Sequence, residues 1–150
     1  MSRVVIASGA AALALVLAVA ACGGSSQSIG RLRGQATRIC QGALAGSDRI
    51  AAPSLASDTA AFLRRGTYVL GPELAQLQAL RPPSDQADTY SAALAAASRQ
   101  VTILDDTIRQ LDGGADPMSV IKALQGKLAP TESSEDAAWR TLGVPGCLSR

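Results

Sequence analysis

Residues 87–112 read ADTYSAALAAASRQVTILDDTIRQLD, and this stretch decides the fold. Its apolar residues recur in alternating steps of three and four, a spacing that places side chains on one face of an α-helix. A register held over more than three heptads is typical of a helix that packs lengthwise in a bundle. We expect it to end at Gly113-Gly114. The positions in register are Ala87, Tyr90, Leu94, Ala97, Val101, Leu104, Ile108 and Leu111.

Three further segments carry a helical spacing of apolar residues. The first runs from Ser28 to about Gly46 and has Cys40 on its apolar stripe. The second runs from about residue 57 to Arg81-Pro82-Pro83, after which Ser84 and Asp85 offer a cap for the following helix. The last starts at Asp116-Pro117, a cap residue followed by proline at the first helical position. Gly143 supplies a left-handed stop at its end.

Two prolines fall inside these helical segments. Proline lacks the backbone donor, and its ring clashes with the carbonyl four residues earlier. We therefore expect the second helix to be kinked or broken at Pro72 and the fourth at Pro130, with a separate helical piece from about residue 131 to Leu142. No useful strand alternation is present. The sequence predicts an all-α fold, an up-down four-helix bundle, over residues 29–150.

The N-terminal segment has the form of an export signal. Met1 and Arg3 are followed by an uncharged stretch, residues 4–21, that ends in the small residues Ala20 and Ala21. An uncleaved membrane helix is the competing interpretation, because about eighteen apolar residues is the lower bound for a span. The small residues at its end, with no basic cluster behind them, favour cleavage.

The residues Val19-Ala20-Ala21-Cys22 resemble the bacterial lipobox, in which a branched apolar residue and two small ones precede a cysteine. The resemblance implies that residues 1–21 are a lipoprotein signal peptide and that Cys22 carries a diacylglyceryl group and becomes the new N-terminus. Residues 22–28 would be the lipidated cysteine and a flexible tether. The partner would be the lipid bilayer, on the extracytoplasmic face of the cell membrane. The alternative is an ordinary signal peptide that a cysteine happens to follow.

The other two cysteines, Cys40 and Cys147, would then lie in an oxidising compartment where a disulfide persists. A bridge between them would close a loop of about one hundred residues, which the chain-entropy model values at roughly 4–5 kcal/mol. Two free, buried thiols are the alternative. We expect Trp139 to be a core residue near this bridge, with a place in a ligand wall as the second interpretation.

The composition excludes several function classes. The chain has no histidine, so Ser-His-Asp or Cys-His catalysis, histidine-ligated haem and the di-iron bundle are ruled out. Asp105 and Asp106 are adjacent on a helix and point about 100° apart, and Asp105 with Arg109 has the spacing of a surface ion pair. Aromatic residues are too few for a nucleic-acid stacking platform. We predict no catalytic residue, metal site, cofactor or nucleic-acid partner, and no enzyme activity.

Three features together resemble a loose group of uncharacterised actinobacterial exported helical proteins. They are Cys40 in the first helix, residues 77–83 (LQALRPP) closing the second, and residues 142–147 (LGVPGC) at the end. The resemblance implies the four-helix fold and the disulfide, and no activity.

Two roles follow for such a tethered bundle. The first is a non-enzymatic interaction or accessory module of the envelope, with an envelope protein as its partner. The alternative is a binding protein for a small apolar or amphipathic ligand held between the helices. A cavity of several hundred cubic ångströms would favour the second role, and a tightly packed seam would oppose it. An enzyme using carboxylates alone would need two acids in one cleft.

Overall fold

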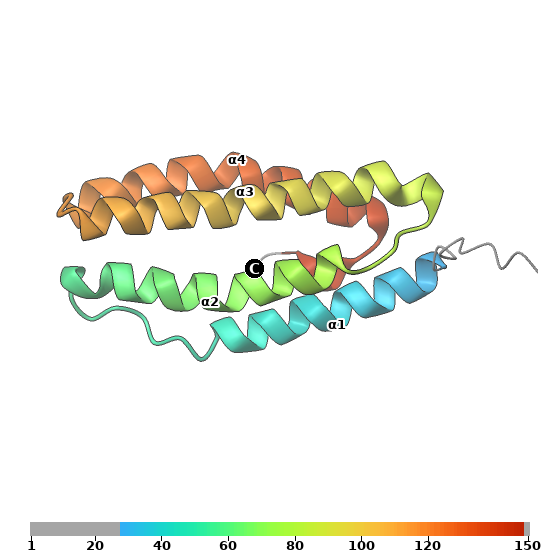
Figure 1. Cartoon of the computed structure of the whole chain (residues 1–150), viewed down its shortest axis with the longest axis horizontal. Coiled ribbons are helices and arrows are strands. Elements are labelled where there is room, and N and C mark those ends of the chain that lie inside the picture. Colours follow the sequence, from blue (N-terminus) through green and yellow to red (C-terminus); the bar gives the residue numbers. More distant parts are fainter. Residues whose placement is uncertain (1–27, 149–150) are drawn as a thin grey trace, which may run out of the picture.

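The computed structural model describes residues 28–148. Four α-helices make up nearly all of this part of the chain, together with three short 3-10 turns (Figure 1). The predicted signal peptide, Cys22 and most of the predicted tether lie outside the described residues. The elements are α1 (Ile29–Ser47), η1 (Ala56–Asp58), α2 (Thr59–Gln78), η2 (Ser84–Gln86), α3 (Ala87–Asp112), α4 (Pro117–Leu142) and η3 (Pro145–Cys147).

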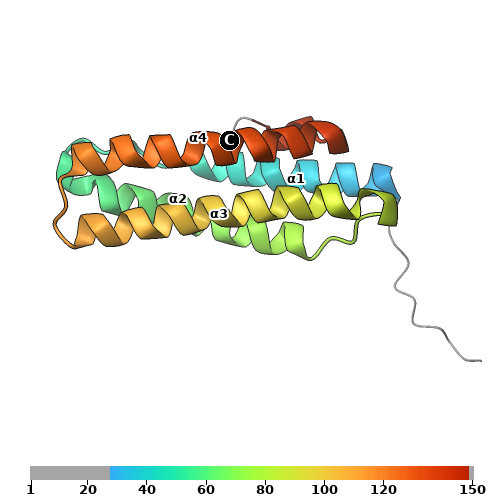
Figure 2. The same cartoon turned by 90° about the horizontal axis from the view of Figure 1, so that it is seen from above.

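The helices form a bundle in which consecutive helices contact one another. Helix α3 packs against α4 and α2, and α1 packs against α2 (Figures 1 and 2). After α4 the chain turns back, so that η3 contacts both α4 and α1. No strand occurs within residues 28–148, which confirms the all-α prediction and the number of main helices. None of the helices in this range is both long and apolar enough to cross a membrane.

Helices α2 and α4 are unbroken at their prolines, so the prediction of a break at Pro72 or Pro130 is wrong. The separate helical piece expected after Pro130 is the second half of α4. Each proline frees the carbonyl four residues earlier, on Tyr68 and on Gly126. Both of these residues are exposed. Water can therefore replace the missing hydrogen bond, and the helix continues.

Capping residues are present at the start of α1 and at both ends of α4, and the two caps of α4 were predicted from the sequence. The Ser28 hydroxyl accepts from the backbone N–H of Arg31, and the Asp116 carboxylate accepts from that of Ser119 at 2.9 Å. Gly143, with φ of 70°, ends α4 in the left-handed conformation that glycine adopts without strain. These local signals confirm three of the predicted boundaries.

The start of α3 differs from the prediction. Ser84 and Asp85 lie in the 3-10 turn η2, and the residue before α3 is Gln86, whose side chain makes no capping hydrogen bond. The residue at an N-cap normally has an extended backbone. Because the helically hydrogen-bonded turn η2 leads directly into α3, no extended residue stands before α3 whose side chain could cap it.

Helix α3 buries a wider face than one apolar stripe. All the positions of the predicted register are buried or half-buried. A second row of residues on α3 is also buried or half-buried, because α3 contacts helices on two sides. Each residue of this row directly precedes a residue of the predicted register. This second row consists of Thr89, Ala93, Ala96, Gln100, Ile103 and Thr107.

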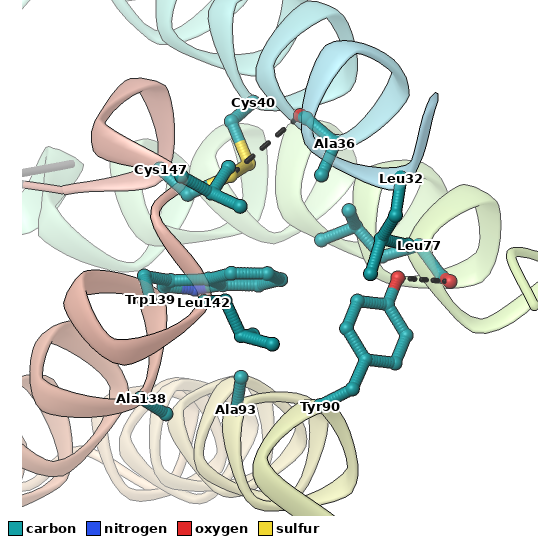
Figure 3. Packing of buried hydrophobic residues seen from close by; sticks show 11 residues of the cluster. Leu32, Ala36, Cys40, Leu77, Tyr90, Ala93, Ala138, Trp139, Leu142 and Cys147 are labelled. Atoms are coloured by element: carbon teal, nitrogen blue, oxygen red, sulfur yellow. Dashed lines mark hydrogen bonds between the residues drawn. A yellow bond between two sulfur atoms is a disulfide. The ribbon is translucent and has the colours of Figure 1, made fainter. Parts of the chain in front are cut away.

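The core has two parts along the bundle. One surrounds Trp139, which is fully buried, as the core prediction requires, and packs with the cysteines (Figure 3). The rings of Trp139 and Tyr90 meet edge to face with centroids 5.8 Å apart, and the Tyr90 hydroxyl donates to the Leu77 carbonyl at 2.7 Å. The other part surrounds Leu63, Ile108 and Leu124.

The Cys40–Cys147 disulfide joins α1 to η3, with the two Cα atoms 5.1 Å apart. Close by, the Arg33 guanidinium donates from Nε to the Leu142 carbonyl at 2.6 Å, at the negative end of α4. Arg33 approaches Gly143 so closely that a Cβ there would lie 2.9 Å from its Nε atom. The C-terminal turn is therefore attached to α1 covalently and by a charged hydrogen bond.

Candidate functional site

A cavity of about 580 Å³ lies between the helices. Its wall includes residues of both core parts, such as Leu77 from the first and Leu63 from the second. The volume falls within the range of about 300–1,000 Å³ that is usual for small-ligand pockets. The wall residues are Ala43, Leu44, Ser47, Ile50, Phe62, Leu63, Gly66, Leu70, Glu73, Leu74, Leu77, Ala97, Gln100, Val101, Leu104, Leu128, Glu132, Glu135, Asp136 and Cys147.

Most of the wall is aliphatic, because apolar residues of α1, α2 and α3, together with Leu128 of α4, face it. Ala97, Val101 and Leu104 belong to the predicted register of α3. At these three positions the side chains face the cavity as well as other side chains. The predicted seam of α3 therefore lines a cavity over part of its length.

Glu135 is a buried polar side chain of the wall. It lies in the middle of the second half of α4 and is only 5% exposed. One carboxylate oxygen accepts from the Trp139 indole Nε1 at 2.8 Å, and the other accepts from the Gln100 amide Nε2 of α3 at 2.6 Å. Two donors from two helices thus hold the carboxylate at the edge of the cavity.

Burial raises the pKa of Glu135 above its ordinary value of 4.5. The hydrogen bonds from Trp139 and Gln100 act in the opposite direction, because they stabilise the ionised form. The neighbouring carboxylates of Asp136 and Glu132 raise it further by charge repulsion. Desolvation is the largest of these effects and determines the direction of the shift.

Glu73 brings a second buried carboxylate to the cavity from α2, and it is only 4% exposed. Glu132 and Asp136 complete the acidic part of the wall. Asp136 also pairs with Arg140, at 2.8 Å between Oδ2 and Nη2. Among the wall residues within 28–148, the ionisable side chains are therefore all acidic.

The sequence analysis did not select these buried acids. A signal was present, because Glu73 stands four residues before Leu77 on the apolar stripe of α2, and Glu135 stands four before Trp139. An acid at helical spacing from large core residues lies on the buried face of its helix. The periodicity of apolar residues alone does not reveal such a buried acid.

The residues that the sequence did single out lie in several places. Cys147 lines the cavity as half of the disulfide. Asp105 and Asp106 are not part of its wall. The predicted ion pair of Arg109 with Asp105 is wrong, since Arg109 pairs with Asp106, three residues earlier. Cys22 lies outside the described residues.

Comparison with known proteins does not add to these observations. No family model, curated protein or solved structure matches the chain. Within residues 28–148, no three residues among histidine, cysteine, aspartate and glutamate are grouped so that they could hold a metal ion. The candidate site therefore rests on the cavity and its wall.

Substitution of Glu135 by glutamine should make stability less dependent on pH. Between the ordinary pKa of the unfolded chain and the raised pKa of the fold, the folded state binds more protons, so stability falls as pH rises. Glutamine keeps an oxygen for Trp139 and carries no charge. We expect Glu135→Gln to exceed the wild type in free energy of unfolding at pH 7, and the difference to shrink at pH 4.

Urea unfolding followed by circular dichroism across this pH range provides the measurement. Asp105→Asn is the matched control, because it removes the same charge from an exposed position of α3. A variant that is less stable than the wild type at pH 7 would contradict the expected cost of burying this carboxylate.

Proposed function

We propose that this protein is a membrane-tethered binding protein that holds a small amphipathic ligand between its helices. The cavity of about 580 Å³ carries the proposal. The cavity favours ligand binding over a plain interaction module. A bundle that acts only through its outer face does not need a cavity, and a filled core would make it more stable. An aliphatic wall with a few polar groups at fixed positions is the usual composition of a ligand pocket.

The tether would keep the bundle close to the membrane. With Cys22 acylated, two or more acyl chains give stable anchoring, since each buried methylene contributes about 0.8 kcal/mol. A flexible segment of the length of residues 23–28 reaches on the order of 13 Å. The bundle would then bind its ligand next to the extracytoplasmic face of the cell membrane.

We propose an up-down order for the helices, each antiparallel to the next. The short connections at residues 79–86 and 113–116 and the contacts between consecutive helices support it. We also propose that α2 and α4 bend at their prolines, as interior proline favours. Pro72 lies between the wall residues Leu70 and Glu73, and Pro130 lies between Leu128 and Glu132. Bends at these two points would help to keep the cavity open.

The proposed role is binding and involves no catalysis. Two acids on one cavity, Glu73 and Glu135, are also a condition for carboxylate-only chemistry. However, Glu135 accepts hydrogen bonds on both oxygens from Trp139 and Gln100. Such an arrangement restrains the carboxylate in one orientation, which suits recognition of a ligand more than transfer of a proton.

Filling the cavity should abolish ligand binding. N-phenyl-1-naphthylamine is a neutral dye whose fluorescence rises in apolar surroundings, and we expect one molecule to bind per wild-type chain. Ala97→Phe places a ring in the cavity from α3 and should weaken dye binding at least tenfold. Ala95→Phe adds the same ring at an exposed position of the same helix and should leave binding unchanged. Equal binding by the two variants, or none by the wild type, would refute the proposed function.

The anchor has its own test. The intact mass of protein extracted from the membrane of its host should correspond to a chain beginning at Cys22 with diacyl or triacyl additions, and two hydrogens fewer for the disulfide. Cys22→Ser should abolish the acyl addition. Detection of a processed, unacylated wild-type chain in the aqueous fraction would contradict the anchor and leave the proposal for the cavity in place.

A further inference from the structure

The two sides of the bundle carry opposite formal charge. Helices α1 and α2 lie on one side of the molecule, and α3 and α4 lie on the other (Figures 1 and 2). Residues 28–81, which we call the α1–α2 layer, include seven arginines and three acids. Residues 82–148, the α3–α4 layer, include five lysines and arginines and nine acids. The described part of the chain is therefore divided in space into a basic layer and an acidic layer.

Most arginines of the α1–α2 layer have no acidic partner. Arg33 donates to the Leu142 carbonyl, and Arg64 pairs with Asp112 of α3. The other five arginines of the layer are exposed, and none of them forms an ion pair with any residue in the range 28–148. These five are Arg31, Arg38, Arg49, Arg65 and Arg81. Their charges are available to an anion outside the protein.

Three of the five arginines follow one side of α1. Arg31 and Arg38 are seven residues apart, and Arg49, in the turn after the helix, stands eleven residues further on. Both spacings are close to a whole number of α-helical turns, so the three positions lie nearly in line. The buried residues of α1, which include Leu32 and Cys40, occupy a different side of the helix. The row of arginines therefore runs along the outside of the bundle for about 27 Å.

The α1–α2 layer also exposes large apolar side chains. Within residues 28–148 the exposed large hydrophobic residues of this layer are Leu44, Leu55 and Tyr68, and that of the α3–α4 layer is Met118. Tyr68 is 84% exposed and directly precedes Val69, whose side chain would lie 3.1 Å from a Cβ at Gly46 of α1. Tyr68 thus stands close to the line where α1 and α2 meet. An exposed tyrosine suits the boundary between a membrane and water, because its ring is apolar and its hydroxyl is polar.

A bilayer is the anionic partner that this layer is placed to meet. Helix α1 begins at Ile29, and Cys22 stands six residues before Ser28. With Cys22 acylated, a segment of six residues keeps the start of α1 on the order of 13 Å from the bilayer. Anionic headgroups attract arginines that lie near the membrane surface. Exposed apolar side chains add to this attraction when they enter the headgroup region.

We propose that the α1–α2 layer lies against a bilayer that contains anionic lipids, with its five unpaired arginines at the phosphate groups and Tyr68 among the headgroups. This inference rests on the anchor in the proposed function and adds the orientation of the bundle. The acidic α3–α4 layer then faces away from the membrane, because charges of the same sign repel it. Since the contact is electrostatic and exposed, it weakens as the salt concentration rises.

The test uses a tryptophan as a reporter of contact with lipid. Tyr68→Trp is prepared as the full acylated protein in nanodiscs of dioleoylphosphatidylcholine, either alone or in equal parts with dioleoylphosphatidylglycerol. Both mixtures include a phosphatidylcholine that is brominated near the headgroup and quenches indole fluorescence. We expect the signal from position 68 to be quenched at least twofold more in the anionic nanodiscs, and about 0.5 M sodium chloride to remove the difference. The wild type, whose Trp139 is fully buried, supplies the background.

A reporter on the other layer serves as the positional control. Ala95→Trp places the same indole at an exposed position of α3. It should show little quenching in either lipid mixture, because the α3–α4 layer faces away from the bilayer. Equal quenching of the two reporters would overturn the proposed orientation.

Charge variants assign the contact to the arginines. In the Tyr68→Trp protein, replacing Arg31, Arg38 and Arg65 together by glutamine should reduce quenching in anionic nanodiscs to the level seen with phosphatidylcholine alone. The matched control replaces Arg99, Lys122 and Lys127 by glutamine, which removes three exposed charges from α3 and α4, and it should keep the full quenching. Equal losses in the two triple variants would mean that net charge, and not this layer, determines the contact.

The remaining outcomes separate the inference from the anchor. Equal quenching of the acylated Tyr68→Trp protein in the two lipid mixtures would overturn the inference and leave the anchor standing. A chain that carries no acyl group and does not associate with nanodiscs would overturn both. Binding of the neutral dye in the cavity is measured separately and does not depend on either result.

Discussion

Replacing Cys40 and Cys147 together by alanine should lower the free energy of unfolding by about 4–5 kcal/mol, according to the chain-entropy model. The bridge joins residues separated by 107 positions, so it restricts most of the unfolded chain. Its removal also weakens the attachment of α1, whose main contacts are with α2 and η3. The measurement is guanidinium unfolding followed by circular dichroism.

Reduction provides the control for this first prediction. The wild type with dithiothreitol should unfold at the same denaturant concentration as the double-alanine variant, and dithiothreitol should have no effect on the variant itself. A loss below about 1 kcal/mol on reduction would mean that the core and the Arg33–Leu142 hydrogen bond hold α1 in place without the covalent link.

Truncation of Trp139 to alanine is the second large effect, with an expected loss of about 3–5 kcal/mol, as for other buried aromatic residues. The side chain is fully buried and meets the Tyr90 ring edge to face. Its removal opens a void in the first part of the core. It also removes one of the two donors to the buried Glu135 carboxylate, which leaves a polar group less well satisfied.

Trp139→Phe separates the two contributions. Phenylalanine keeps an aromatic ring in the core and lacks the indole donor, so we expect a loss of about 1–3 kcal/mol at pH 7. The hydrogen bond from Trp139 stabilises the ionised form of Glu135 and lowers its pKa. The loss should therefore decrease below the pKa of Glu135, where the folded wild type is protonated. A loss that does not change with pH would exclude this hydrogen bond as its source.

The helical segments could be predicted from the sequence because their signals are local. The three-and-four spacing, the Asp116-Pro117 start and the Gly143 stop each depend on residues within one or two turns. The predicted break at Pro130 failed for a reason that is not local. A proline interrupts a helix where the freed carbonyl cannot be solvated, and exposure is a property of the assembled bundle.

The candidate site was missed for a related reason. Asp105 and Asp106 drew attention because they are adjacent in the sequence, and neither lines the cavity. The spacing from Trp139 places Glu135 on the buried face of α4, but its partner Gln100 stands 35 residues away on α3, and only the tertiary structure brings the two together. A register of apolar positions shows which face of a helix is buried. It does not show whether the side chains of neighbouring helices contact one another across that face.

The sequence by itself determined the four helical segments, the points where the chain turns and the two cysteines available for a bridge, because each depends on nearby residues or on composition. Only the tertiary structure decided that a cavity remains between the helices and that four acidic residues line it. The wall is assembled from residues between Ala43 and Cys147. Its shape depends on how side chains from all four helices pack together, and no single stretch of sequence contains that information.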